Sequence, residues 1–189
     1  MAGSHSGCKI LLTGAPGIGK TTVIKKVCEK LRTDNRITVC GFYTEEVREN
    51  GQRRGFDVVT LDGNRCVLAR KSEATLKRKS FPSVGQYYVD IQSFESLALQ
   101  SMKEEINSVI VIDEIGKMEV FSQKFSSAVR RIFNESKSPI LATIPISKGK
   151  TLAVVEEISS RGDVQIITVS RDNRDKLVSE IAEQILAPI

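Results

Sequence analysis

One octapeptide near the start of the chain constrains the fold more than any other stretch, because it fits the phosphate-binding template G-x-x-x-x-G-K-[ST] at every specified position. Its residues are Gly14, Ala15, Pro16, Gly17, Ile18, Gly19, Lys20 and Thr21. An apolar run, Ile10–Leu12, precedes the octapeptide, and a helical pattern opens at Thr22. The glycines allow a tight turn in which successive backbone N–H groups point into one concavity that holds an anion. We therefore predict a strand, a phosphate-binding loop and a helix in that order, with all eight loop residues binding nucleotide.

Two side chains of this loop have predicted roles in the chemistry. Lys20 can reach the β- and γ-phosphates of a bound nucleotide, so we assign it a binding role and a catalytic role. The Thr21 hydroxyl is a candidate ligand of Mg²⁺, which prefers hard oxygen atoms. The helix that follows adds the positive end of its dipole beside the phosphates.

Length and composition indicate an ordinary globular protein. The chain has 189 residues, of which 40% are apolar and 27% are charged, which is enough for one domain with a proper core. Residues 1–7 are small and polar and are predicted to be flexible, and residues 8–189 are predicted to form a single domain. No window approaches the ~20 apolar residues of a membrane span. We expect a monomer that does not associate with membranes.

The cysteines indicate the cellular compartment, and the position of the histidine limits the possible catalytic residues. Cys8, Cys28, Cys40 and Cys66 lack the spacing of a metal site, and three of them lie in apolar-patterned segments. We interpret them as buried free thiols of an intracellular, reducing compartment, the cytoplasm, with the nucleus as the alternative. The one histidine, His5, lies in the N-terminal segment, which excludes catalysis by histidine.

The formal charge of +5 is compatible with binding to nucleic acid, but the pattern of residues does not favour it. The one basic cluster is Lys77–Lys79, and only 5% of residues are aromatic, so platforms for base stacking are scarce. A triphosphate ligand alone accounts for part of the basic charge. We interpret the cluster as a solvated loop, expect nucleoside triphosphates as ligands, and identify no nucleic-acid or protein partner.

The turn signals predict an antiparallel insertion. Asn50-Gly51 is the strongest two-residue hairpin signal because both residues tolerate a positive φ angle, and Asp62-Gly63 marks a second turn of that kind. Apolar and β-branched residues flank both turns, so residues 41–69 are predicted to form a meander. Elsewhere the periodicity predicts strands over residues 8–13, 39–44, 86–91, 108–112, 139–144 and 164–169, and helices beginning near residues 22, 94, 121, 152 and 177.

This alternation of strands and helices predicts an α/β fold. Specifically, we expect a P-loop NTPase architecture, a three-layer α/β/α sandwich with a mostly parallel sheet and the inserted antiparallel meander. Residues 70–84 are predicted to be a basic loop, and Asp172 is predicted to cap the last helix.

A second motif follows the central strand. Residues 108–112 are apolar and β-branched with almost no alternation, which is typical of a strand covered on both faces of a parallel sheet. The strand ends in Asp113 and Glu114. An aspartate at this position holds the Mg²⁺ shell in nucleotide hydrolases, so we predict Asp113 and Thr21 as the metal ligands. Glu114 can accept a proton from an attacking water, which favours hydrolysis because kinases must exclude water. Glu114 is the predicted catalytic carboxylate.

Further candidates have weaker signals. Lys117 is predicted either to touch a phosphate or to face water. Thr143 ends the next strand, where a polar residue can sense the γ-phosphate, although strand propensity alone also explains it. Arg171 and Arg174, after the last strand, can stack on a base of any identity, and surface arginines at a helix start are the slightly favoured interpretation.

An arginine that stabilises the γ-phosphate oxygens raises the rate of hydrolysis by roughly 10³–10⁵-fold in enzymes that use one. The sequence does not favour any one of the candidates for this role. They are Arg48, Arg53 and Arg54 on the hairpin and Arg78 in the basic loop.

Blocks of the sequence resemble a nucleoside-triphosphatase family that includes the vertebrate cancer-related nucleoside triphosphatase and forms from heat-loving bacteria and archaea. The resemblance runs from about residue 9 to residue 185. The specific blocks are Gly41–Arg48, with Gly-Phe-Tyr-Thr-Glu-Glu, and Ile112–Glu119, with Asp-Glu-Ile-Gly-Lys-Met. The remaining matching segments are residues 14–22, 54–61, 84–87 and 149–150.

This resemblance implies Mg²⁺-dependent hydrolysis of ATP, GTP, CTP and UTP to diphosphates, with broad base tolerance and slow turnover. It places nucleotide contacts on the phosphate-binding loop and on a second segment, which consists of Val109, Ile110, Val111, Ile112, Asp113, Glu114, Ile115 and Gly116. Two alternatives remain open. One is a nucleoside or nucleotide kinase with residues 70–79 as a lid, and the other is a nucleotide-dependent RNA- or protein-binding switch.

Overall fold

The computed structural model describes residues 7–71, 81–146, 149 and 151–187. His5, the basic cluster Lys77–Lys79 with the candidate Arg78, and Lys150 lie outside the described residues, as does the rest of the proposed lid at residues 72–79.

One sheet of nine strands runs through the described part of the chain. In spatial order its strands are β5 (Ser83–Val84), β6 (Tyr87–Val89), β4 (Arg65–Lys71), β3 (Gln52–Thr60), β2 (Thr38–Glu49), β7 (Ser108–Asp113), β8 (Ile140–Thr143), β1 (Lys9–Thr13) and β9 (Val164–Thr168). The helices are α1 (Lys20–Leu31), α2 (Ile91–Ser101), α3 (Gln123–Glu135), α4 (Ala153–Ser159) and α5 (Arg174–Leu186), with a 3₁₀ turn, η1, at Glu119–Phe121.

The sheet has a parallel part and an antiparallel part. Strands β2, β7, β8, β1 and β9 run parallel to one another. Strands β3, β4, β6 and β5 continue the sheet from β2 with antiparallel pairing. The predicted α/β fold with an inserted meander is confirmed, and β6 and β5 extend that meander by two short strands. Because the neighbouring strands β7, β8 and β1 run parallel, their carboxyl ends meet at one edge of the sheet.

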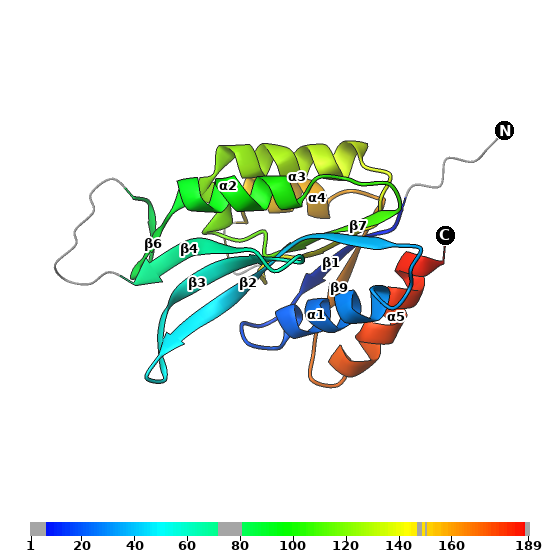
Figure 1. Cartoon of the computed structure of the whole chain (residues 1–189), viewed down its shortest axis with the longest axis horizontal. Coiled ribbons are helices and arrows are strands. Elements are labelled where there is room, and N and C mark those ends of the chain that lie inside the picture. The colour runs from blue at the N-terminus through cyan, green and yellow to red at the C-terminus, as the bar shows by residue number, and fades with distance from the viewer. Residues whose placement is uncertain (1–6, 72–80, 147–148, 150, 188–189) are drawn as a thin grey trace.

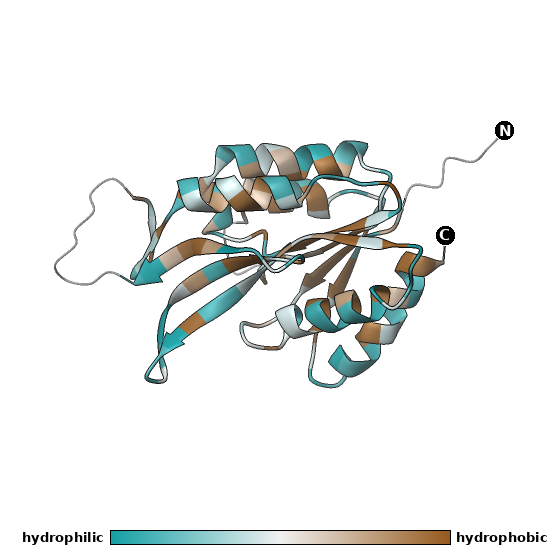
Figure 2. Cartoon of the chain, viewed as in Figure 1, coloured by the Kyte–Doolittle hydropathy of each residue, from teal (hydrophilic) through white to brown (hydrophobic). Residues whose placement is uncertain are grey.

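Helices cover both faces of the sheet and make the three predicted layers. Helices α1 and α5 lie on one face, and α2, α3 and α4 lie on the other (Figure 1). The central strand β7 is buried on both sides, since Val109 and Val111 pack in the α1–α5 cluster while Ile110 and Ile112 pack in the opposite one. Figure 2 shows the apolar residues concentrated on the sheet and on the helix faces turned toward it.

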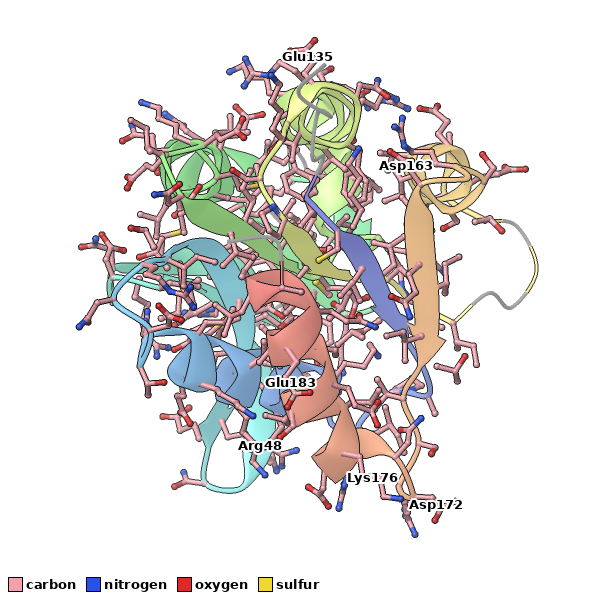
Figure 3. The ribbon with its side chains drawn as sticks, turned by 90° about the vertical axis from the view of Figure 1, so that its right-hand side faces the viewer. Arg48, Glu135, Asp163, Asp172, Lys176 and Glu183 are labelled. Atoms are coloured by element: carbon pink, nitrogen blue, oxygen red, sulfur yellow. The ribbon has the colours of Figure 1, made fainter. Side chains whose placement is uncertain are left out.

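The meander begins with a long hairpin. Asn50 and Gly51 have positive φ angles of 49° and 75°, as the predicted tight turn requires. The predicted second turn is also present, with the Gly63 N–H donating to the Thr60 carbonyl at 3.0 Å. The hairpin tip, near Arg48, lies at the same end of the molecule as the start of α5, marked by Asp172 and Lys176 (Figure 3).

Strand β2 joins the parallel and antiparallel parts of the sheet, and its backbone lies very close to that of β7. Its residue Gly41 pairs with Val111 of β7 and has a φ angle of 109°. A Cβ atom on Gly41 would lie only 1.9 Å from the Val111 carbonyl oxygen. The backbone of β7 therefore reaches this separation from β2 only because residue 41 is a glycine.

Several element ends differ from the predictions. The segment predicted as a loop over residues 70–84 carries the end of β4 and the short strand β5. Helix α3 begins after Ser122, whose side chain accepts from the Phe125 N–H at 3.0 Å. Helix α5 begins after Asn173, not Asp172, and the Asn173 side chain accepts from the Ser170 N–H at 2.8 Å. Local side-chain hydrogen bonds, which periodicity does not encode, set these ends.

All four cysteines are free thiols. Burial raises the pKa of Cys28 to about 12 and the pKa of Cys40 to about 11. Burial also raises the pKa of the Cys8 and Cys66 thiols. Among the described residues, no helix is both long enough and apolar enough to cross a bilayer.

Candidate active site

The phosphate-binding loop forms a concave turn between β1 and α1. Its Gly19 stands immediately before α1 with a φ angle of 108°, a conformation that a residue with a Cβ rarely adopts. No side chain caps the start of α1, and its first turn has no acidic residue. The backbone N–H groups at this helix start therefore remain available to an anion from outside.

Lys20 extends across this loop. Its Nζ donates to the Gly14 carbonyl at 3.1 Å, so the cation lies over the concavity where the amides converge. A single hydrogen bond to a carbonyl leaves two ammonium protons for phosphate oxygens. That Lys20 contacts the phosphates of a nucleotide stays a prediction.

Asp113 ends β7 at the same edge of the sheet. Ile112 pairs with Ala142, so the next residues on the two strands, Asp113 and Thr143, are neighbours. The Thr143 hydroxyl donates to Asp113 Oδ1 at 2.6 Å. Thr143 is therefore held by the aspartate, a contact that the sequence alone did not predict.

The other carboxylate oxygen of Asp113 has no such partner. Asp113 is only 1% exposed, and its Oδ2 accepts no hydrogen bond from any residue in the described part of the chain. Burial raises the pKa of this carboxyl, while the Thr143 and Thr21 hydroxyls and the charge of Lys20 oppose the rise. A buried oxygen without a partner is costly, so a ligand is expected here.

A divalent metal fits this corner of the site. Thr21, at the start of α1, lies close enough to Asp113 for its hydroxyl to influence the carboxyl. The two side chains offer hard oxygen atoms, which Mg²⁺ prefers, and substrate phosphates usually supply further ligands. No group of three His, Cys, Asp or Glu residues within the described ranges forms a metal cage. This corner therefore fits a metal ion that binds together with the phosphates of a ligand.

Glu114 lines a cavity of about 840 Å³. The same cavity is lined by Gly14, Pro16 and Lys20 of the phosphate-binding loop and by Lys117. Burial raises the pKa of the Glu114 carboxyl, the charge of Lys20 opposes this, and Asp113 adds to it. The structure thus brings the two predicted catalytic residues, Lys20 and Glu114, into one cavity with the loop.

Comparison with known proteins shows the family. A family model described as NTPase matches residues 9–182. The cancer-related nucleoside-triphosphatase homolog of Bos taurus is 49% identical over 178 residues, which cover 91% of this chain and 93% of the relative. The nucleoside-triphosphatase THEP1 of Aquifex aeolicus is 38% identical over 182 residues, covering 92% and 96% of the two chains. The chain belongs to this nucleoside-triphosphatase family.

Solved structures from the same family have the same fold. The solution structure of a human cancer-related nucleoside triphosphatase superposes with a TM-score of 0.82 at 46% identity and covers 96% of this chain and 99% of that one. The crystal structure of THEP1 from Aquifex aeolicus gives a TM-score of 0.76 at 38% identity, with coverage of 92% and 96%.

The second segment to which the resemblance assigns nucleotide contacts divides into two groups in this nucleoside-triphosphatase. The first group is fully buried in the sheet or beneath it, and consists of Val109, Ile110, Val111, Ile112 and Ile115. These side chains hold the strand that carries Asp113. In the second group only Glu114 lines the cavity, while Asp113 is buried with one oxygen lacking a partner among the described residues and Gly116 is buried with its N–H bonded to Glu119.

The arginines that are candidates for stabilising the γ-phosphate differ in the residues that they contact. Arg48 and Arg53 both pair with Glu46, and Arg54 pairs with Glu49, at 2.6, 2.7 and 2.8 Å. These ion pairs hold the hairpin arginines on their own hairpin.

The arginines after the last strand lie nearer the loop. The guanidinium of Arg174 donates to the Ile18 carbonyl of the phosphate-binding loop at 3.4 Å. Arg174 also lines a second cavity of about 190 Å³, together with Gly19, Thr22 and Lys26. Arg171 is exposed.

One carboxyl group of this family member was missed by the sequence reasoning. Glu119 is only 5% exposed, and its Oε2 accepts from the Gly116 N–H at 3.1 Å. A Cβ on Gly116 would lie 2.8 Å from Glu114 Oε1 and 2.9 Å from Glu119 Oε2, so both carboxyls crowd the same glycine. Burial, reinforced by the charge of Glu114, raises the pKa of Glu119 to about 8. The only sequence signal for Glu119 was its place in the family-specific block.

This raised pKa predicts a dependence of stability on pH. Between pH 4.5, the ordinary value, and about 8, the native chain keeps a proton on Glu119 that the unfolded chain has released. The free energy of unfolding therefore falls as the pH rises through this window. The Glu119→Gln variant cannot ionise and keeps an acceptor for the Gly116 N–H. Its melting temperature should exceed that of the wild type at pH 7, and the gap should shrink toward pH 5.

Thermal unfolding of the wild type and the Glu119→Gln variant from pH 5 to pH 8 measures the difference in melting temperature. This difference is large enough to measure, because about 1 kcal/mol shifts Tm by roughly 2–4 °C in a chain of this size. Glu183, on the outer face of α5 (Figure 3), supplies the control variant Glu183→Gln, whose gap should stay constant with pH. A pH-independent gap for Glu119→Gln would contradict the assignment of a protonated carboxyl.

Proposed function

We propose that the chain hydrolyses nucleoside 5′-triphosphates to nucleoside diphosphate and phosphate, with Mg²⁺ as cofactor. The observation that carries the proposal is the convergence of three parts on one edge of the sheet. These are the amide-lined loop with Lys20, the partner-free oxygen of Asp113, and Glu114 in the adjoining cavity. We further propose that the protein acts as a monomer inside the cell.

In this proposal each residue has a separate task. The loop amides and Lys20 bind the β- and γ-phosphates, and Thr21 and Asp113 would hold the metal. Bound there, Mg²⁺ would neutralise charge on the phosphate oxygens. Thr143 keeps Asp113 oriented through its 2.6 Å hydrogen bond.

Glu114 acts as the general base. The water oxygen attacks the γ-phosphorus, its proton passes to the Glu114 carboxylate, and the bond from the γ-phosphorus to the bridging oxygen breaks. Burial raises the pKa of Glu114, which brings it closer to the operating pH, where general bases work best.

The base of the nucleotide is proposed to lie near Arg174. The γ-phosphate must face Glu114, so the rest of the nucleotide leaves the loop at its opposite end, beside Thr22 and Lys26. An arginine can stack on any base, which supports hydrolysis of ATP, GTP, CTP and UTP at similar rates. A phosphate-release panel with these four substrates, with and without Mg²⁺, tests the reaction and its selectivity together. No release from any of them would refute the proposal.

Removal of the Lys20 amine is expected to weaken triphosphate binding and hydrolysis together. In the Lys20→Ala variant the phosphates lose a cation that contacts them both before and during reaction, so kcat/KM should fall by about 10²-fold or more. Nucleotide titration and steady-state phosphate release measure the two effects. The Lys103→Ala variant, which removes an exposed lysine between α2 and β7, serves as the control and should match the wild type.

A further inference from the structure

Two cavities flank the phosphate-binding loop, and one nucleotide does not account for both. The smaller, about 190 Å³, lies at the Thr22 end of the loop, where the nucleoside is proposed to leave. The larger, about 840 Å³, lies at the Glu114 end. The terminal phosphates enter the larger cavity beside Gly14, Pro16 and Lys20, but the attacking water adds only about 30 Å³. The cavity extends well beyond these residues to Ile166 and Ser160. It falls within the roughly 300–1,000 Å³ typical of small-molecule sites.

We propose that the larger cavity is a binding site for a second substrate, a nucleoside whose hydroxyl accepts the γ-phosphoryl group in place of water. This inference rests on the direction of the triphosphate given under the proposed function. It adds a phosphotransferase activity to the hydrolysis.

The walls of the cavity suit the flat ring of a nucleoside. One side is aliphatic and consists of Ile144, Pro145, Ile146, Leu152, Val155 and Ile166. Ile146 and Ile166 are 39% and 45% exposed, and they are two of the four large apolar side chains that are exposed in the described part of the chain. An apolar patch that opens into a cavity beside charged groups is a common sign of a ligand site.

Other residues of the lining offer polar groups for the sugar or the ring edge. Ser159 and Ser160, at the end of α4, line it together with Glu156. The Ser159 Oγ is buried and has no hydrogen-bond partner among the described residues. A buried hydroxyl without a partner is costly, and a hydroxyl or amide of a ligand would satisfy it.

The cavity is lined by two carboxyls, Glu114 and Glu156, and by two lysines, of which Lys20 is engaged by the bound triphosphate. With Lys20 so engaged, the remaining charges do not favour a further phosphate, and Glu114 can take the proton of a hydroxyl. In the transfer step the hydroxyl oxygen forms a bond to the γ-phosphorus as its proton passes to Glu114. The bond to the bridging oxygen breaks, and the nucleoside diphosphate leaves with that electron pair. The products are a phosphorylated nucleoside and a diphosphate, so the step needs no further reactant.

The test follows a labelled γ-phosphate. ATP labelled at the γ-position, Mg²⁺ and the full-length protein are incubated without additive, with each of adenosine, guanosine, cytidine, uridine and thymidine, or with the corresponding monophosphates. Chromatography separates labelled phosphate from labelled products. We expect labelled nucleoside monophosphate from at least one nucleoside, and none from water alone.

A cavity-filling variant locates the acceptor. Ile166→Trp places a large ring in the cavity from an edge strand, and Ile106→Trp changes an equally apolar residue that is 90% exposed and outside it. We expect Ile166→Trp to reduce the labelled nucleoside product at least tenfold while phosphate release without acceptor stays within about twofold of the Ile106→Trp control.

The outcomes separate the two proposals. No labelled nucleoside product from any nucleoside, with phosphate still released, overturns the second-substrate site and leaves hydrolysis intact. Transfer only to monophosphates also overturns it, because the proposed acceptor is an uncharged nucleoside. If the two tryptophan variants form the labelled nucleoside product equally well, the acceptor does not bind in this cavity. Absence of both phosphate release and transfer refutes the proposed hydrolysis itself.

Discussion

The Glu114→Gln variant is expected to lose about 10²–10⁴-fold in kcat while nucleotide affinity stays within about twofold of the wild type. The amide has nearly the size and shape of the carboxylate, but it cannot accept the proton of the attacking water. Lys20 and the loop amides, which bind the phosphates, are untouched. The loss should therefore appear in turnover and not in binding.

Single-turnover phosphate release and titration with a slowly hydrolysed nucleotide measure the two quantities separately. Glu29→Gln, an exposed position in α1, is the control for a loss of one negative charge. An unchanged kcat in Glu114→Gln would remove this residue from the mechanism. A parallel loss of affinity would show that Glu114 acts on binding instead.

The Gly41→Ala variant is expected to be the most damaging single substitution in the sheet. Alanine at a φ angle of 109° is strained by about 1–2 kcal/mol. Its Cβ would also lie 1.9 Å from the Val111 carbonyl oxygen, so β2 and β7 must move apart at about 1–3 kcal/mol more. A chain of ordinary stability has only about 5–15 kcal/mol in total. The variant should therefore unfold at markedly lower urea concentration.

Gly63 provides a matched control for this prediction. It has a similarly positive φ angle, 94°, but no heavy atom lies within 4 Å of the position that an alanine methyl group would take there. Gly63→Ala therefore carries the strain without the clash, and the difference between the two variants isolates the approach of β2 to β7. Equal urea midpoints for the two variants would contradict the argument. Since β7 carries Asp113, residual activity in Gly41→Ala should also fall.

The local parts of the fold were predictable from sequence. The strand before Gly14 and the buried strand β7 follow from apolar runs, and the hairpin follows from Asn50-Gly51, because each depends on neighbouring residues alone. The joint position of Lys20 and Glu114 followed from the two motifs together. The resemblance to the nucleoside-triphosphatase family is confirmed by identities of 49% and 38% over nearly the whole chain.

The contacts that cross between strands were not predictable in the same way. Thr143 reaches Asp113 only because β8 is inserted between β7 and β1. The hydrophobic periodicity of a sequence does not specify the order of strands in the sheet. The sequence assigned no role to Glu119, and only the turn after β7 buries it against Gly116. The large cavity depends on how α4 lies relative to β9 and the phosphate-binding loop, which involves residues about 150 positions apart in the chain.

The protonated thiols of the four cysteines have a practical consequence for optical experiments. Thiolate is the form that reacts with maleimide dyes, and full burial of Cys28 and partial burial of Cys8, Cys40 and Cys66 raise their pKa values and so lower the thiolate fraction at neutral pH. A single cysteine introduced by Gly51→Cys at the exposed hairpin tip would thus take up a fluorophore ahead of the native thiols. The wild-type background then allows hairpin motion during turnover to be followed in real time without first removing the natural sulfhydryls.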